Sequence, residues 1–261
     1  MLTTDSVISR GLRPHLRIGM GAGEDRRKVI DSAEAAQRTG HGAVTIYDDP
    51  VEMARDLRDG RIDAAVRGDL DSNDAMSAVR EAFGVPKVLR AAFMKPEGGR
   101  LFLLAPVGVD EGWTVPEKVE LARLCAATVR RLGVEPVIGM MSGGRSSDKG
   151  RMAEVDRTID DALQALSILA EDGLRAKDVQ ILIEDAVKDC DVIIAPDGIS
   201  GNLIFRTLHF LGGGVAMGAP VLNIDRVYID TSRAKASYVD SVALAAALAD
   251  ERDRAIRPPR V

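Results

Sequence analysis

The sequence predicts an α/β protein, and three observations carry this prediction. Short apolar runs alternate along the chain with longer amphipathic segments, which is typical of βαβ units around a parallel sheet. Two further apolar runs flank the polar turn "KPEGGR" and predict an antiparallel hairpin. The chain has 261 residues, of which 46% are hydrophobic and 29% charged, enough for one large or two modest globular domains.

The first block of alternation holds three pairs of a strand and a helix. Runs such as "AVTIY" have the length and composition of strands, and segments such as "PVEMARDLR" have helical spacing of their apolar residues. The predicted pairs are 15–20 with 24–38, 43–47 with 50–58 and 62–68 with 73–83, and the hairpin strands are 87–94 and 100–107.

The second block begins after a linker at 111–116, where Gly112, Trp113 and Pro116 interrupt the pattern. Its predicted elements are helices near 116–132, 154–171 and 203–211 and strands at 136–142, around 179–183 and at 191–196. A second linker is expected at 212–220, and residues 221–251 then supply another strand and a final helix.

Composition excludes several classes of protein. A formal net charge of -5 and a pI of about 5.4 argue against nucleic-acid binding, which needs clustered Lys and Arg. No apolar run reaches the roughly 18 residues that span a bilayer, so we expect a cytoplasmic protein with no membrane contact. Cys125, Cys190 and the scattered histidines lack metal-ligand spacing, so no metal site is expected. Scarce Asn and Gln beside abundant charge indicate a thermophile.

Glycines follow the first predicted strand in "RIGMGAGED". Gly19, Gly21 and Gly23 could form a dinucleotide or S-adenosylmethionine loop at the start of the next helix. The third glycine falls too early for G-x-G-x-x-G, and "YDDP" is only a loose match to the acidic ribose ligand. A tight strand-to-helix turn is therefore favoured.

The turn "VRGDLDSNDAM" ends the third predicted strand. Gly68 closes the strand, Ser72 or Asn73 is expected to cap the next helix, and Arg67 lies nearby. Backbone amides in such a turn can cradle a phosphate, and a helix cap without a ligand fits the residues equally well.

A Gly/Ser loop, "MMSGGRSSDKGR", follows the strand at 136–142. Amide and hydroxyl donors together with cations suit a phosphate or pyrophosphate, although a solvated loop without a ligand is the alternative. The candidate ligands in this loop are Ser142, Gly143, Gly144, Arg145 and Lys149.

Two more turns complete the candidate set. "DGISGN" places Asp197, Gly201 and Asn202 between a buried strand and a helix expected to begin after Asn202, and either a plain turn or a ligand site fits the spacing. Ser232 and Arg233 follow the last strand, where a hydroxyl beside a guanidinium can hold a phosphoryl oxygen. By itself the pair is more typical of a helix cap.

Taken in order, these stretches resemble the phosphate acetyl/butyryltransferase family, and "DGISGN" is also similar to the acyl-phosphate synthase of phospholipid synthesis. The resemblance implies two α/β/α lobes around a cleft, as in isocitrate dehydrogenase and phosphotransacetylase, with lobes at 1–112 plus 220–261 and at 113–219. It implies acyl transfer between an acyl phosphate and coenzyme A. It also implies a homodimer, and catalytic roles for Ser232 and Arg233 at the bound phosphate.

Closer still is the similarity to the methanogen family MtxX, or methanogenesis marker protein 4, carried by "SGGRSSDKGR", "VDRTIDDA" and "DGISGNLIFRTLHFLGGG". That family is described as methyltransferase-related. The resemblance implies an archaeal protein that binds a small anion, coenzyme A or a related phosphorylated coenzyme. It also implies a methyltransferase, or a non-catalytic partner of a methyltransferase subunit in methanogenesis.

The match to the acyltransferases departs from their pattern at the catalytic base. Their aspartate that deprotonates the coenzyme A thiol is replaced by Ser237, and Asp240 is expected on another turn. Their Thr-Asp after the second hairpin strand is replaced by Ala105 and Pro106. A positioned base contributes roughly 100-fold to 10,000-fold, so binding is expected to survive better than turnover.

Overall fold

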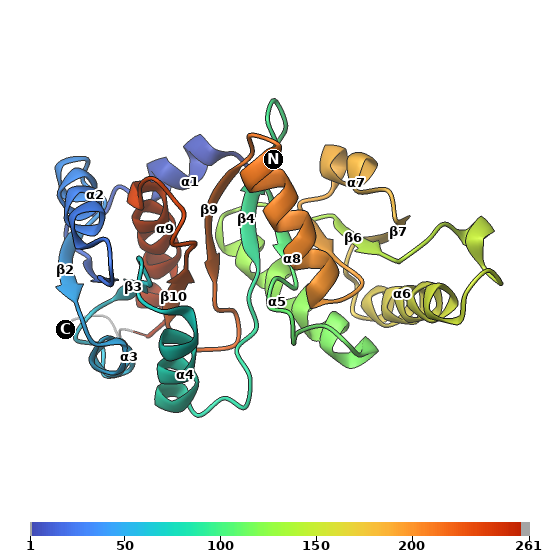
Figure 1. Cartoon of the computed structure of the whole chain (residues 1–261), viewed down its shortest axis with the longest axis horizontal. Helices are drawn as coiled ribbons and strands as arrows, with labels where there is room; N and C mark the ends of the chain where they lie inside the picture. Colours follow the sequence, from blue (N-terminus) through green and yellow to red (C-terminus); the bar gives the residue numbers. More distant parts are fainter. Residues whose placement is uncertain (1, 257–261) are drawn as a thin grey trace. The chain divides into compact units, whose positions relative to one another are not determined.

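The structure, a computed structural model, describes residues 2–256 and forms two compact units (Figure 1). The N-terminal unit comprises Thr4–Val88 and the chain from Met217 onward, and the central unit comprises Leu89–Ala216 with Leu2 and Thr3. The domain boundaries implied by the resemblance, 1–112 plus 220–261 and 113–219, stay a prediction.

Parallel strands form most of the sheet of the N-terminal unit, in the order β2-β1-β3-β10-β9. Strand β9 is antiparallel, and it pairs with β10 through Ala219 and Pro220. The strands are β1 (Arg17–Gly21), β2 (Ala43–Tyr47), β3 (Ala64–Val66), β9 (Val215–Pro220) and β10 (Val227–Asp230). Because β1, β2, β3 and β10 run in one direction, the loops that follow them leave the sheet at one edge.

Helices cover this sheet with their apolar residues inward. They are α1 (Thr4–Arg10), α2 (Arg26–Arg38), α3 (Pro50–Arg58), α4 (Ser72–Phe83) and α9 (Val239–Ile256). The sequence sets their ends: Asp25 and Asp49 cap α2 and α3, and Gly84 ends α4 in the left-handed region. A core cluster joins α3 and α4 to the sheet through Tyr47 and Tyr228.

The central unit repeats the pattern, with strand order β4-β5-β8-β6-β7. Its strands are β4 (Ala92–Lys95), β5 (Phe102–Ala105), β6 (Ile138–Met141), β7 (Ala176–Gln180) and β8 (Val192–Ile194). Strands β4 and β5 form the predicted antiparallel hairpin, and β5, β8, β6 and β7 are parallel. Its α-helices are α5 (Val115–Arg131), α6 (Ala153–Glu171), α7 (Ile183–Asp189) and α8 (Gly198–Arg206). A short 3-10 helix, η1 (Ser146–Asp148), and a short π-helix, η2 (Thr207–Leu211), complete the unit.

Most predicted elements are confirmed, and three were not predicted from the sequence. Helices α1 and α7 have seven residues each, too few for a clear apolar period. Strand β9 lies in the segment expected to be a linker, 212–220. The sequence did not predict it because Gly218 and Pro220 give that stretch the composition of a turn. A Cβ at Gly218 would overlap the Ile229 side chain on β10, so this glycine permits close strand pairing.

Two general findings apply to the described residues. No helix in the part of the chain that the structure describes is long and apolar enough to cross a membrane. Within residues 2–256, no three His, Cys, Asp or Glu side chains are grouped so that they could hold a metal ion.

Candidate functional site

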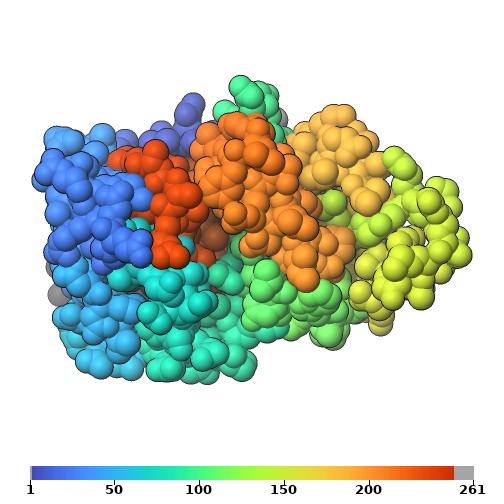
Figure 2. Space-filling model, viewed as in Figure 1, coloured from blue at the N-terminus to red at the C-terminus, as the bar shows by residue number. Residues whose placement is uncertain are grey.

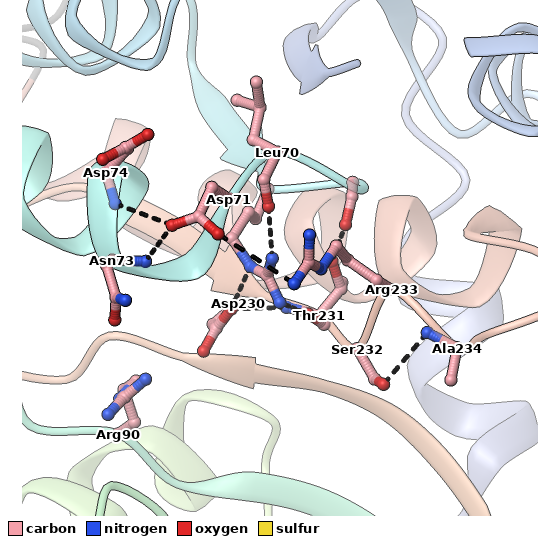
Figure 3. Close-up of polar contacts among 12 residues, drawn as sticks. Leu70, Asp71, Asn73, Asp74, Arg90, Asp230, Thr231, Ser232, Arg233 and Ala234 are labelled. Atoms are coloured by element: carbon pink, nitrogen blue, oxygen red, sulfur yellow. Dashed lines mark hydrogen bonds and ion pairs between the residues drawn. The ribbon is translucent and has the colours of Figure 1, made fainter. Parts of the chain in front are cut away.

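Three loops meet at the carboxyl edge of the N-terminal unit's parallel strands. Strand β3 lies between β1 and β10 and is parallel to both, so residues 22–25, 67–71 and 231–235 emerge side by side. Ligands of open α/β sheets bind at this kind of edge. The Gly68 turn and the Ser232-Arg233 pair therefore belong to one local structure (Figure 3).

Arg67 joins two of these loops from within. Its side chain is only 6% exposed, and its Nε donates to Asp230 Oδ1 at 2.5 Å. Nη1 donates to the Leu70 carbonyl at 2.5 Å, and Nη2 donates to the Thr231 carbonyl. Each guanidinium nitrogen thus has a protein partner. Arg67 therefore holds the loop after β3 to the loop after β10, and its side chain is not exposed to a ligand. We call these contacts the Arg67 clamp.

Backbone packing explains the glycines at this edge. Gly68 has φ +61, and a Cβ there would overlap the Gly21 carbonyl oxygen. The Gly68 carbonyl accepts a hydrogen bond of 2.7 Å from Thr231 Oγ1. A Cβ at Gly23 would lie 2.5 Å from the Asp69 carbonyl oxygen. The favoured interpretation of "GMGAGED" as a tight turn agrees with this packing.

Asp69 ties the loop after β1 to the turn after β3. It is buried, and its carboxylate accepts hydrogen bonds from the backbone nitrogens of Gly23 at 2.6 Å and Asp25 at 2.5 Å. Asp71, two residues later, caps α4 by accepting from the nitrogens of Asn73 and Asp74. These backbone hydrogen bonds and the more distant Arg233 hold the pKa of Asp71 below its ordinary value. Asp71 is thus the cap expected at Ser72 or Asn73, and Ser72 is the first helical residue.

Ser232 and Arg233 lie at the outer end of the clamp. Ser232 Oγ accepts a hydrogen bond of 3.2 Å from the Ala234 nitrogen (Figure 3). The Arg233 side chain is 51% exposed and its Nη2 lies 3.9 Å from Asp71 Oδ2, longer than a direct charge-assisted hydrogen bond. The Arg233 carbonyl accepts a hydrogen bond of 2.8 Å from Lys28 Nζ on α2. The backbone of the pair is therefore anchored while the guanidinium faces solvent.

An ion pair stands where the loop enters α9. Lys235 is 9% exposed, and its Nζ lies 2.7 Å from both carboxylate oxygens of Asp240 in the first turn of α9. Burial lowers the pKa of Lys235, and the Asp240 charge opposes this effect. The Asp240 carboxylate is therefore neutralised by a close ammonium, whereas the Ser237 side chain is exposed.

The central unit has a corresponding edge. Strand β8 lies between β5 and β6 and is parallel to both, so the loops after these strands share one edge. These loops hold the other predicted site residues, at 142–149 and 197–202. Their side chains are used mainly in contacts within the unit.

The loop 142–151 is bound to α6 at several points. Ser142 Oγ is buried and donates to the Gly144 carbonyl at 2.9 Å, and Gly143 N donates to Thr158 Oγ1 at 2.8 Å. Lys149 Nζ lies 2.5 Å from Asp160 Oδ1, and this contact raises the pKa of Lys149. The Arg145 side chain is exposed, so its guanidinium faces solvent, whereas the Lys149 ammonium contacts Asp160.

Asp197, Gly201 and Asn202 hold α8 against the loop after β5. Asp197 caps α8 by accepting from Ser200 N at 2.8 Å, so the helix begins at Gly198. The prediction that the helix starts after Asn202 is wrong for this reason. A Cβ at Gly201 would overlap the Pro106 carbonyl oxygen, and Asn202 Nδ2 donates to the Val107 carbonyl at 2.8 Å. The Asn202 amide group thus already has a backbone partner.

Sequence reasoning missed a buried ion pair between Glu111, in the segment expected to be a linker, and Arg90, in the first predicted hairpin strand. Glu111 is fully buried, and it accepts from Arg90 Nε at 2.9 Å and from Arg90 N at 3.0 Å. Burial raises the pKa of Glu111, and Arg90 opposes the shift. Asp69 and the Arg67 clamp were missed in the same way, because an isolated charged residue in a turn gives no signal of burial.

The predicted site residues thus fall into two local groups. Gly68, Ser72, Ser232 and Arg233 gather in the N-terminal unit, and the remaining candidates lie in the central unit. A single ligand site that draws on both groups stays a prediction.

Comparison with known proteins identifies relatives of this chain by sequence. A Methanosarcina mazei protein named "Putative methyltransferase mtx subunit X" is 40% identical over 263 residues, 94% of this chain and 94% of its own length. An uncharacterized methyltransferase of Methanopyrus kandleri is 41% identical over 203 residues, 76% of this chain and 79% of its own length. No family model matches the chain.

The fold has solved counterparts. A phosphotransacetylase from Streptococcus pyogenes matches with a TM-score of 0.69 at 17% identity, covering 96% of this chain and 98% of its own. The predicted α/β class and phosphotransacetylase-like architecture are therefore confirmed, as is the resemblance carried by the motifs. This chain belongs to the mtx subunit X family and has the fold of the phosphotransacetylases.

Proposed function

We propose that the Ser232-Arg233 loop binds a phosphorylated or coenzyme-type anion, and that the protein acts as a transferase on it. One observation carries the proposal. The loop stands at the carboxyl edge of parallel strands, its backbone is anchored by the Arg67 clamp and Lys28, and the exposed Arg233 guanidinium has a long ion pair with Asp71. An exposed guanidinium on an anchored backbone, beside a hydroxyl, suits recognition of phosphoryl oxygens.

Coenzyme A or a related phosphorylated coenzyme is the cofactor class we propose. Ser232 and Arg233 would hold its phosphate or that of an acyl phosphate, and the coenzyme would supply the thiol that accepts the acyl group. The fold supports this assignment because a solved structure that shares it is a phosphotransacetylase. In the central unit, Arg145 and Lys149 stay predicted phosphate contacts, and Arg145 is the more available because Lys149 contacts Asp160.

The acyl-transfer version needs a base for the thiol. Ser237 is no such base, and the Lys235 ammonium neutralises Asp240. We therefore expect slow or absent acyl transfer together with retained anion binding. The assay offers acetyl phosphate and coenzyme A to the pure protein and measures acetyl-coenzyme A. Formation no faster than background rules out the acyltransferase version and leaves the binding proposal in place.

Methyl transfer is the second candidate, and the names of the sequence relatives favour it. The same names support a non-catalytic role beside a methyltransferase subunit in methanogenesis. Transfer of a labelled methyl group to a corrinoid or thiol acceptor would support the enzyme. Retrieval of a methanogenesis methyltransferase from native extract would support the accessory role, and retrieval of none would count against it.

The test of the central proposal is a thermal-shift screen. It compares phosphate, coenzyme A, S-adenosylmethionine and nicotinamide nucleotides, with Ser232→Ala and Arg233→Gln as matched variants. A ligand at 100 times its dissociation constant stabilises the folded protein by about 2.7 kcal/mol. We expect shifts with phosphate and coenzyme A that both variants reduce. The proposal fails if the two variants respond as the unaltered protein does.

A homodimer is also part of the proposal. Exposed apolar side chains on α8 and η2 support it, and Figure 2 shows α8 in orange on the face in view. They are Ile199, Leu203, Phe210 and Leu211. Light scattering coupled to size exclusion should give the mass of two chains, and Leu203→Glu should halve it. A single-chain mass for the unaltered protein would contradict the dimer.

A further inference from the structure

A pocket in the N-terminal unit lies beside the Ser232-Arg233 loop. It has a volume of about 580 Å³, within the range of small-molecule sites. Its walls are the first turns of α2 and the loop that leads into α9, and Figure 2 shows the orange-red atoms of that loop against the blue atoms of α2. The lining residues are Asp25, Arg27, Lys28, Asp31, Ser32, Arg233, Ala234, Lys235, Ala236 and Ser237.

The lining is rich in charged side chains, and it exposes more polar than apolar surface. Its side chains include the cations of Arg27, Lys28, Arg233 and Lys235 against the carboxylates of Asp25 and Asp31. Two alanines supply the apolar side chains of this lining, so the pocket does not suit a hydrophobic molecule. The excess of cations favours an anion.

Of the four cations in the lining, two have a close carboxylate partner and two have a more distant one. Arg27 is 3.0 Å from Asp31, and Lys235 is 2.7 Å from Asp240, so these charges are closely compensated. Lys28 Nζ is 3.7 Å from Asp25, and Arg233 Nη2 is 3.9 Å from Asp71. Charge-assisted hydrogen bonds have lengths of about 2.7–2.9 Å, so both ion pairs are loose.

Lys28 is also held in place. Its side chain is 16% exposed, its Nζ donates to the Arg233 carbonyl at 2.8 Å, and it lies 5.2 Å from the centre of the Tyr238 ring. An ammonium fixed by these contacts loses little side-chain entropy when an anion binds. Lys28 is therefore a pre-positioned cation at the pocket, beside the exposed guanidinium of Arg233.

We propose that this pocket binds a second phosphate group of the ligand, which would make the ligand a diphosphate or another multiply phosphorylated small molecule. The inference rests on the proposed function, because Arg233 belongs both to the Ser232-Arg233 loop and to the pocket wall. One phosphate lies at Ser232 and the guanidinium, and the next lies in the pocket near Lys28. Neither the sequence motifs nor the names of relatives assign Lys28 or the pocket a role.

The test measures binding of inorganic pyrophosphate and inorganic phosphate to the full chain by calorimetry. Ser237 is exposed in the pocket wall, so Ser237→Glu adds a negative charge there, and Ser237→Gln is the neutral control of equal size. Ser9→Glu adds the same charge on α1, outside the pocket lining. We expect saturable pyrophosphate binding that Ser237→Glu weakens at least about tenfold relative to Ser237→Gln, whereas Ser9→Glu leaves it within about twofold of the unaltered protein.

The outcomes separate this inference from the proposed function. If Ser232→Ala weakens phosphate binding while Ser237→Glu leaves pyrophosphate binding unchanged, the pocket proposal is overturned and the proposed function stands. If Ser237→Glu weakens pyrophosphate binding and Ser232→Ala changes neither ligand, the pocket binds an anion by itself, and the Ser232-Arg233 proposal falls together with the link between the two sites. Absence of saturable pyrophosphate binding to the unaltered protein overturns the pocket proposal.

Discussion

The two units place similar loops at the carboxyl edges of parallel strands and use their polar side chains differently. In the central unit, the Asn202 amide donates to the Val107 carbonyl and the Lys149 ammonium contacts Asp160. In the N-terminal unit, Arg67 makes the internal contacts and leaves the neighbouring Arg233 exposed. A motif residue is therefore available to a ligand only where another residue supplies the structural contacts.

The largest effect should come from removing the clamp. Arg67→Leu leaves Asp230 without its buried guanidinium partner, and we expect a loss of about 3–5 kcal/mol in the free energy of unfolding. Urea denaturation measures it. Arg26→Leu removes an exposed ion pair with Asp48 and should cost at most about 1 kcal/mol. Equal losses in the two variants would show that the clamp does not hold these loops.

A smaller loss should follow from crowding α8 in the central unit. Gly201→Ala places a Cβ on the Pro106 carbonyl oxygen and should cost about 3 kcal/mol of unfolding free energy. Gly173 has φ +73 and open space where a Cβ would stand, so Gly173→Ala should cost only the backbone strain, about 1–2 kcal/mol. Thermal unfolding of both variants ranks the costs, and the reverse order would contradict the packing argument.

Asn202 distinguishes a structural amide from a ligand contact. Asn202→Ala leaves the Val107 carbonyl without its donor, and we expect a loss of about 1–2 kcal/mol in unfolding free energy. Asn73→Ala, at an exposed position on α4, should change stability by less than about 0.5 kcal/mol. If Asn202→Ala unfolds like the unaltered protein but loses anion binding, the amide serves the ligand instead.

The smallest change in stability is expected at Arg233. Its side chain is half exposed and its ion pair with Asp71 is long, so Arg233→Gln should alter the unfolding free energy by less than about 0.5 kcal/mol. Phosphate binding, measured on the same sample by calorimetry, should weaken. A large loss of stability would mean that Arg233 is a structural residue like Arg67 and would erase the contrast between them.

Much of the fold could be predicted from the sequence because its local signals are strong. The strand at 43–47 and the helix at 50–58 were predicted with the observed ends, since Asp49 and Pro50 mark the helix start. The short helices α1 and α7 were missed because seven residues are too few to show an apolar period. Strand β9 was missed because its glycine and proline give it the composition of a turn. Sequence also indicated which turns follow strands, and these turns contain the candidate site residues.

The internal contacts of the site could not be predicted in the same way. Arg67 and Asp230 are 163 positions apart, and only the parallel pairing of β3 with β10 brings them together. From sequence, Arg67 and Arg233 are both plausible phosphate contacts in their turns. Burial separates them, and burial depends on strands that are distant along the chain.

The position of β10 in the sheet affects how the chain can fold during synthesis. This strand lies between β3 and β9, yet it is made more than half a chain after β3. Until residues 227–230 leave the ribosome, β3 has an unpaired edge, and such edges recruit other chains. A protein cut short before β10 should therefore aggregate, and the Ser232-Arg233 loop can take up its observed position only after β10 has been made.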